Sequence, residues 1–123
     1  MNNYDLEVKQ RFGETDVYKE YAQKTANYSK DKFQEINDGL MAVFVKFAEC
    51  MKNGHTADSD DAQVLVKELQ NYITENYYTC TKEILTGLGL MYVADERFKA
   101  NINKSGDGTA EFVSKAIENY ING

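Results

Sequence analysis

Proline and tryptophan are both absent from this chain of 123 residues. Without proline, no helix meets an internal breaker, and turns depend on glycine, asparagine and aspartate. Long apolar runs are also absent, since the longest, Leu40 to Val45, is far too short to span a bilayer. Met1 is not followed by the charged and then apolar leader of a signal peptide. These absences together predict a cytoplasmic protein.

Basic residues and cysteines are scarce. The 14 lysines and arginines are outnumbered by 20 acidic residues, which gives a formal net charge of −6. Because nucleic-acid affinity depends on neutralising phosphates with a basic face, this balance argues against direct contact with nucleic acid. Cys50 and Cys80 lack the spacing of metal ligands. We therefore expect two free thiols and no metal or other cofactor.

His55 is the single histidine, and its place in a loop beside Gly54 predicts an exposed side chain. Any Ser-His-Asp or Cys-His set would need this one imidazole. No catalytic residues are identified, and the chain is not expected to be an enzyme.

Three acidic residues, Asp58, Asp60 and Asp61, look briefly like part of a calcium loop. The positions of such a loop that require glycine and glutamate hold Gln63 and Leu69 here. Capping of the following helix accounts for these acids, so no metal site is predicted.

Helical periodicity and aromatic side chains are what the chain does have. Nine tyrosines and six phenylalanines contribute to a hydrophobic fraction of 42%. A domain of this size can bury a core without disulfides or metals. Apolar residues recur every three or four positions without strand-like alternation, which predicts a single all-α domain of about six helices. Seven candidate segments underlie this estimate, of which the first is weak: 3–12, 16–26, 29–53, from Asp58 or Ser59 to about 77, 82–94, a short piece after Asp95, and a last helix after Gly108.

The first segment is weak, because Tyr4, Val8 and Phe12 form one thin apolar stripe on a helix of marginal length. Some flexibility is therefore expected in this segment. The segment that begins at Ser29 is the strongest, since its apolar stripe is continuous.

Two features near the fifth helix stand out. The run Tyr77-Tyr78-Thr79-Cys80 places a thiol just before a helix N-terminus, whose dipole can lower a thiol pKa. A packed turn with a buried thiol is the alternative interpretation. Gly87 and Gly89 lie inside the helix, where each costs about 1 kcal/mol relative to alanine. They indicate the close approach of either another helix or a ligand.

Several motifs together resemble one known family. The most specific is the twelve-residue stretch from Gly87 to Phe98, which is followed by Asn101-Ile102 and Gly108. The other matching motifs are Arg11-Phe12-Gly13-Glu14-Thr15, Lys24-Thr25-Ala26-Asn27-Tyr28-Ser29, Ala57-Asp58-Ser59 and Tyr77-Tyr78-Thr79-Cys80. On these motifs, which span about residues 10–120, the chain resembles the TipAS-type antibiotic-recognition domain of MerR-family transcription activators.

The resemblance implies a globin-like helical fold without haem. It also implies a cleft between helices that binds macrocyclic thiopeptides and other bulky, multi-ring antibiotics, over which the N-terminal helices close. On this resemblance we expect a single ligand-binding domain, in which residues 1–28 form an N-terminal lid segment and residues 29–123 form the helical core. The DNA-binding module and coiled-coil linker of MerR regulators are not in these residues. The expected roles are therefore the effector domain of a regulator whose DNA-binding module lies outside this chain, or a free-standing protein that sequesters the drug and confers multidrug resistance.

Two positions depart from the family pattern. Members that capture thiopeptides covalently carry a second cysteine seven residues after the one that matches Cys80, and that position here is Gly87. The aromatic position before Gly13, often tryptophan in the family, is Phe12. The resemblance therefore favours non-covalent binding and leaves the reactivity of Cys80 open.

A site for a bulky apolar molecule is expected to have aromatic and aliphatic walls and few polar groups. We expect the cleft to be formed by Phe44, Phe47, Tyr77, Tyr78, Cys80, Ile84, Gly87, Leu88, Met91 and Tyr92, with Phe12, Tyr18 and Tyr21 closing over it. The same residue types at helical spacing are also typical of an ordinary core.

Two other functions stay open at this point. A structural or dimerisation domain would dock Tyr4, Val8 and Phe12 on a partner. A haem-type sensor on the same fold would need a helix-borne histidine that faces the cleft, whereas His55 lies in a loop.

Overall fold

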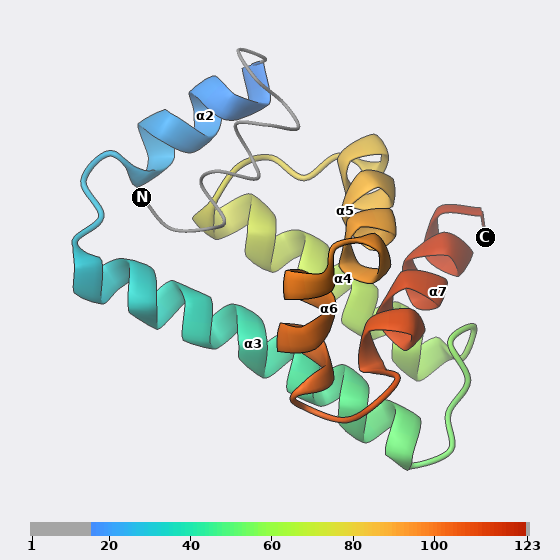
Figure 1. Cartoon of the computed structure of the whole chain (residues 1–123). Coiled ribbons are helices and arrows are strands. Elements are labelled where there is room, and N and C mark those ends of the chain that lie inside the picture. Colours follow the sequence, from blue (N-terminus) through green and yellow to red (C-terminus); the bar gives the residue numbers. More distant parts are fainter. Residues whose placement is uncertain (1–15, 123) are drawn as a thin grey trace.

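The computed structural model describes the backbone of residues 16–122 and the side chains of residues 19–122. Over this range the chain forms six helices and no strand (Figure 1), which confirms the all-α prediction. The predicted segment at 3–12, with Tyr4, Val8 and Phe12, lies outside the described residues. The helices are α2 (Asp16–Thr25), α3 (Lys30–Lys52), α4 (Asp60–Asn76), α5 (Lys82–Ala94), α6 (Glu96–Asn103) and α7 (Thr109–Asn122).

Four helices begin at a residue whose side chain accepts a hydrogen bond from a backbone amide of the first turn. These residues are Ser29 for α3, Ser59 for α4, Thr81 for α5 and Asp95 for α6. Of the two residues predicted to begin α4, Asp58 and Ser59, the structure uses Ser59. Each cap contributes about 1 kcal/mol to helix stability.

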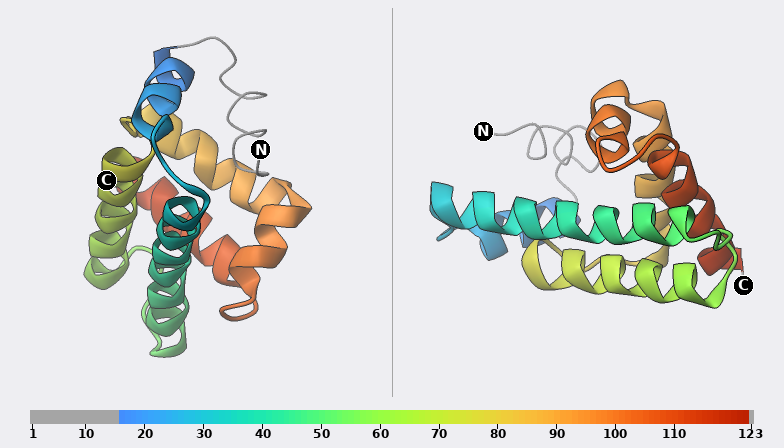
Figure 2. Two further views of the ribbon diagram at one scale, coloured as in Figure 1. Left: turned by 90° about the vertical axis from the view of Figure 1, so that its left-hand side faces the viewer. Right: turned by 90° about the horizontal axis from the view of Figure 1, so that it is seen from below.

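The helix α7 lies at the centre of the packing, where it contacts α3, α4, α5 and α6. The long helices α3 and α4 run antiparallel, side by side (Figure 2). A Cβ added to Gly89 of α5 would lie 3.3 Å from Ile117 Cγ2 of α7. Close helix packing therefore accounts for this glycine. The large side chains less than 2% exposed in this core include Phe47, Val66, Leu69, Ile73, Leu85, Ile102, Val113 and Ile117.

A second close approach joins α3 to α4 at Gly39. A Cβ added there would overlap the hydroxyl of Tyr72 and lie 2.9 Å from Tyr72 Cζ. The same hydroxyl donates a 2.7 Å hydrogen bond to the carbonyl oxygen of Ile36. The Tyr72 ring is thus held over the backbone of α3, where only glycine leaves room for it. Glycine inside a helix costs about 1 kcal/mol of stability relative to alanine.

Gly39→Ala should lower the free energy of unfolding by about 1–3 kcal/mol, because the new methyl group displaces Tyr72 from its hydrogen bond. In a Tyr72→Ala background the same substitution should instead stabilise by up to about 1 kcal/mol, through helix propensity alone. Urea unfolding followed by circular dichroism measures all four proteins. A stabilising effect of Gly39→Ala in both backgrounds would contradict the packing described here.

The connection between α4 and α5 is buried, although it has no regular structure. Tyr77 is 1% exposed, Tyr78 0% and Cys80 3%. Its backbone groups nevertheless have partners: the amides of Tyr77 and Tyr78 both donate to the carbonyl of Ile73. The Cys80 amide donates to Thr74 Oγ1, and the Cys80 carbonyl accepts from Gln70 Nε2. This pairing removes the cost that unpaired polar groups would impose on a buried loop.

Helix α2 docks on the same connection through charged and polar side chains. Lys24 Nζ donates to the carbonyl of Thr74 at 2.6 Å. Since α4 has no basic residue in its last turn, this cation stands where a helix C-terminus favours positive charge. The carboxylate of Glu20 accepts from both the amide and the hydroxyl of Thr79, at 2.8 and 2.6 Å. These hydrogen bonds lower the pKa of Glu20.

Candidate functional site

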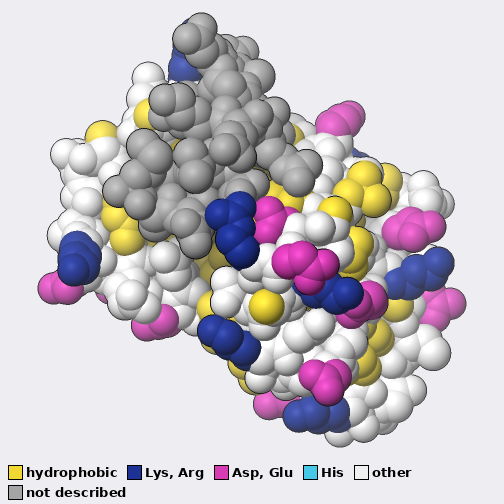
Figure 3. All heavy atoms as spheres, in the orientation of Figure 1, with side chains coloured by type: hydrophobic (Ala, Val, Ile, Leu, Met, Phe, Trp, Pro, Cys, Tyr) yellow, Lys and Arg dark blue, Asp and Glu magenta, His cyan; other side chains and the backbone are white. Residues whose placement is uncertain are grey.

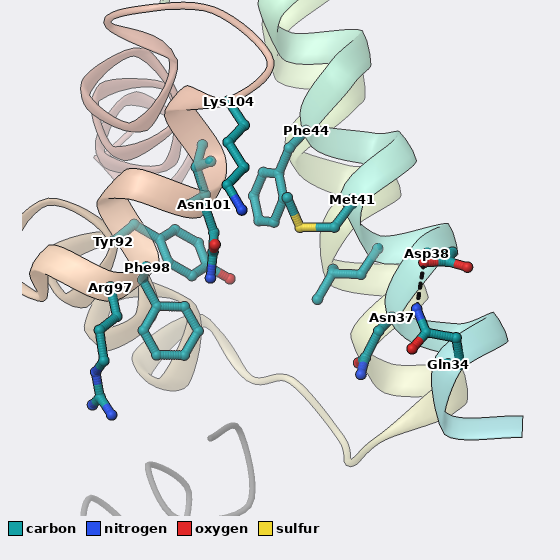
Figure 4. A pocket seen from close by; sticks show the side chains of 12 residues that line it. Gln34, Asn37, Asp38, Met41, Phe44, Tyr92, Arg97, Phe98, Asn101 and Lys104 are labelled. Atoms are coloured by element: carbon teal, nitrogen blue, oxygen red, sulfur yellow. Dashed lines mark hydrogen bonds between the residues drawn. The ribbon is translucent and has the colours of Figure 1, made fainter. Parts of the chain in front are cut away.

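A cleft of about 440 Å³ lies between α3 and α6 and reaches the end of α5. Figure 4 shows the side chains of α3 on one wall and those of α6 on the other. The apolar residues around it are Leu40, Met41, Phe44, Tyr92, Phe98 and Ile102. The polar residues are Gln34, Asn37, Asp38, Arg97, Asn101 and Lys104. An apolar lining with a few polar groups is the usual composition of a small-molecule site.

The aromatic residues of the cleft come from three different helices. Tyr92 on α5 packs edge-on against Phe44 on α3, with ring centroids 5.4 Å apart. Its other neighbour is Phe98 on α6, at 6.3 Å. The chain bends between α5 and α6 at Asp95, whose side chain caps α6. That bend brings Tyr92 and Phe98 to the same wall.

The polar residues of the cleft differ in how firmly they are held. Gln34 Nε2 donates to Asp38 Oδ1 at 2.8 Å, and both side chains are exposed. Arg97 pairs with Asp95 at 3.2 Å, and its hydrogen bond lowers the pKa of that carboxyl. Asn37 Oδ1 accepts a 2.7 Å hydrogen bond from the buried hydroxyl of Tyr77. Asn37 is thus the cleft residue that is anchored from inside the core.

Positively and negatively charged side chains are mixed on the face of the molecule that Figure 3 shows. Figure 3 shows lysine and arginine side chains interspersed with aspartate and glutamate, with apolar side chains between them. Within the described residues, no group of three or more His, Cys, Asp or Glu is placed to hold a metal ion. None of the described helices combines the length and apolarity that a membrane crossing requires.

The structure brings two of the expected site residues, Phe44 and Tyr92, to this cleft. Three others, Tyr21, Tyr77 and Tyr78, form an aromatic cluster beneath α2, with Tyr21 ring centroids 6.4 Å from each of its neighbours. The remaining members of the expected set with buried side chains are Phe47, Cys80, Ile84, Leu88 and Met91.

Three expected site residues need separate mention. Phe12 lies outside the described residues, and Tyr18 is described only as part of the backbone of α2. Gly87 is half-buried, and a Cβ added there would meet no described atom within 4 Å. Within the described part of the chain, close helix packing thus explains the glycine at position 89 but not the one at position 87.

Several cleft residues escaped the sequence analysis. Phe98 and Ile102 were assigned to a short helix, and Leu40 to the apolar stripe of α3, without a link to a site. Asn37 gave no signal, since asparagine on a helix face is common. The usable clues were the family motifs that end at Phe98 and include Asn101-Ile102, and the short helix that follows Asp95.

His55 lies away from the cleft, in the loop between α3 and α4. Its side chain is 42% exposed and its Nε2 is 3.0 Å from Asp61 Oδ2. The exposed position predicted for it is confirmed. A haem-type sensor would need an imidazole at the cleft, and this histidine is not placed to supply one.

Cys80 is a buried thiol rather than an activated one. Burial raises its pKa from 9.0 to about 12, opposite to the effect that a helix N-terminus alone would have. Burial likewise raises the pKa of Cys50, which is 7% exposed. Both side chains are therefore protonated near neutral pH. The packed turn is the interpretation that the structure supports.

Raising the pH above about 9 should destabilise the fold, because the unfolded chain loses the Cys80 proton before the folded chain does. The loss begins at the usual thiol pKa of 9.0 and continues to about 12. For one group the slope approaches about 1.4 kcal/mol per pH unit. Buried tyrosines such as Tyr92 act in the same direction at higher pH, since burial raises their pKa also.

Cys80→Ala should flatten the fall between pH 9 and 10, where tyrosines contribute least. Urea unfolding at a series of pH values measures this slope for both proteins. An unchanged slope in the variant would show that ionisation of the buried thiol is not its cause.

A protein-family model and curated relatives both match this chain over most of its length. The TipAS antibiotic-recognition domain family matches residues 4–120. The HTH-type transcriptional activator TipA of Streptomyces coelicolor is 38% identical over 116 residues, which is 94% of this chain and 46% of that protein. The HTH-type transcriptional activator mta of Bacillus subtilis is 33% identical over 117 residues, covering 95% and 44%. The chain thus spans about half the length of these relatives.

The fold also matches a solved structure. TipAS of Streptomyces lividans, in complex with the thiopeptide antibiotic nosiheptide, superposes with a TM-score of 0.83 at 37% sequence identity. The match covers 97% of this chain and 83% of that chain. The globin-like helical fold that the sequence led us to expect is confirmed.

Proposed function

The chain belongs to the TipAS antibiotic-recognition domain family, and on this premise we propose that it binds thiopeptides and similarly bulky, multi-ring antibiotics in the cleft between α3 and α6. The observation that carries the proposal is the cleft itself, about 440 Å³ with an apolar lining from three helices. Likeness to a domain solved with nosiheptide supports the class of ligand.

Affinity would come mainly from burying apolar surface, at about 25 cal/mol per Å². Phe98 is the most available aromatic, because it is half-buried while Phe44 and Tyr92 are 3% and 4% exposed. Tyr92 packs against Phe98, and Phe44 packs in turn against Tyr92. Leu40, Met41 and Ile102 supply aliphatic contacts, and the polar residues orient the ligand.

Ligand binding would act by changing the relative populations of two conformations of the protein. A ligand that favours one arrangement of the N-terminal residues over another stabilises that arrangement by its difference in affinity. In a longer MerR-type regulator, this change would pass to an N-terminal DNA-binding module. As a free-standing protein in the cytoplasm, the domain would sequester the drug instead. Both roles require binding and no catalysis.

Nosiheptide at 100 times its dissociation constant should add about 2.7 kcal/mol to the free energy of unfolding. Thermal unfolding with and without the compound measures this shift. Phe98→Ala should raise the dissociation constant at least tenfold, since about 1.5–3 kcal/mol of aromatic burial is lost.

Phe112→Ala is the matched control. Phe112 is also half-buried and also packs against one core aromatic, with its ring centroid 6.4 Å from Phe47, but it does not line the cleft. Both variants should lose stability, and only Phe98→Ala should lose affinity. Equal affinity losses in the two variants, or an unshifted wild-type protein, would contradict the proposal.

Binding is proposed to be non-covalent. Cys80 is 3% exposed, so it is neither ionised nor accessible near neutral pH, and Gly87 stands where a capturing cysteine would be required. After incubation with nosiheptide and denaturation, intact-mass spectrometry should show the unmodified chain. A Gly87→Cys variant provides the positive control for adduct formation. A mass increase of one nosiheptide in the wild-type protein would show that one of the two native thiols reacts.

A further inference from the structure

One buried hydroxyl reaches from the core to the cleft. Tyr77 follows the last turn of α4, and its side chain is 1% exposed. Its hydroxyl donates a 2.7 Å hydrogen bond to Asn37 Oδ1, forty positions earlier on α3. The bond therefore links the buried α4–α5 connection to a side chain that lines the cleft.

This bond decides which way the Asn37 amide points. A carboxamide has one accepting oxygen and one donating NH₂ group. Because the hydroxyl gives its proton to Oδ1, the NH₂ group occupies the other branch, and among the described residues it has no hydrogen-bond partner. Burial raises the pKa of Tyr77 well above its usual value, so the hydroxyl keeps its proton throughout the physiological range.

The other polar residues of the cleft are held differently. Gln34 and Asp38 bond to each other on the exposed surface, and Arg97 pairs with Asp95. Lys104 forms no ion pair within the part of the chain that is described. Asn37, opposite Phe98 in Figure 4, combines a fixed orientation with an available donor.

We propose that Asn37 determines the specificity of this cleft by donating a hydrogen bond from its side-chain NH₂ to an uncharged acceptor of the ligand, such as a peptide carbonyl, and that Tyr77 positions it. The proposal rests on the function proposed above. A ligand that covers Asn37 with apolar surface would leave the donor buried and unpaired, which costs more than the bond itself contributes. The residue thus selects for an acceptor at one place on an otherwise apolar ligand.

Asn37→Asp gives the sharpest test, because it keeps an acceptor for Tyr77 and removes the donor. Isothermal titration calorimetry with nosiheptide should show a dissociation constant roughly 3- to 10-fold higher in this variant, and a similar loss in Asn37→Ala. Thermal unfolding without ligand should show that Asn37→Asp folds as the wild-type protein does.

Tyr77→Phe tests the positioning role. It should weaken binding by about two- to fourfold, because the amide is then free to turn. In an Asn37→Ala background it should have almost no further effect, since the two residues act as one unit. Tyr72→Phe is the matched control: it also removes a tyrosine hydroxyl that bonds α3, at the Ile36 carbonyl, but leaves Asn37 untouched. It should cost stability without changing affinity.

The amide resonances of the Asn37 side chain give a readout that a structural role would not move. They are assigned by their disappearance in Asn37→Asp and should shift when nosiheptide binds. Unchanged affinity in both Asn37 variants, alongside weakened binding in Phe98→Ala, would overturn this inference and leave the proposed function standing. Absence of nosiheptide binding to the wild-type protein would overturn both.

Discussion

The buried connection between α4 and α5 is the constraint on which the rest of this structure depends. Four consecutive residues without regular structure, Tyr77 to Cys80, lie mostly inside the domain, and their backbone groups must be paired there. Two elements supply partners to the backbone: α4 through the Ile73 carbonyl and α2 through Glu20. Helix α3 contributes Asn37, which accepts a hydrogen bond from the side-chain hydroxyl of Tyr77. Each of these partners also fixes the position of its own helix, so the connection joins α2, α3 and α4.

The cleft owes its shape to a second set of contacts, between α3, α5 and α6. Phe44 and Tyr92 are almost fully buried and serve as a rigid support, while α6 carries Phe98 at the surface after a capped bend. The wall can therefore present apolar surface without collapsing. The same packing places the thiol of Cys80 out of reach, which connects the shape of the core to non-covalent binding.

The sequence predicted the parts of the fold that local rules decide. Serine, threonine and aspartate caps and the three- and four-residue spacing located the helices closely, because capping and amphipathic burial act within one segment. They could not separate site from core, since Tyr78 and Phe98 are both large aromatic residues, and only the arrangement of the neighbouring helices makes one buried and the other part of the cleft. Gly39 was overlooked because its reason is a tyrosine on another helix. The sequence also left two interpretations of Cys80 open, because the pKa of the thiol depends on long-range burial as well as on the local helix dipole.

The central claim is that the cleft between α3 and α6 holds the antibiotic. Nuclear Overhauser effects between unlabelled nosiheptide and the isotope-labelled chain measure this most directly. The account predicts intermolecular contacts to Phe98, Met41 and Leu40 from both walls of the cleft. Contacts confined to a surface outside the cleft, such as the hollow lined by Leu90 and Ile121, would contradict it.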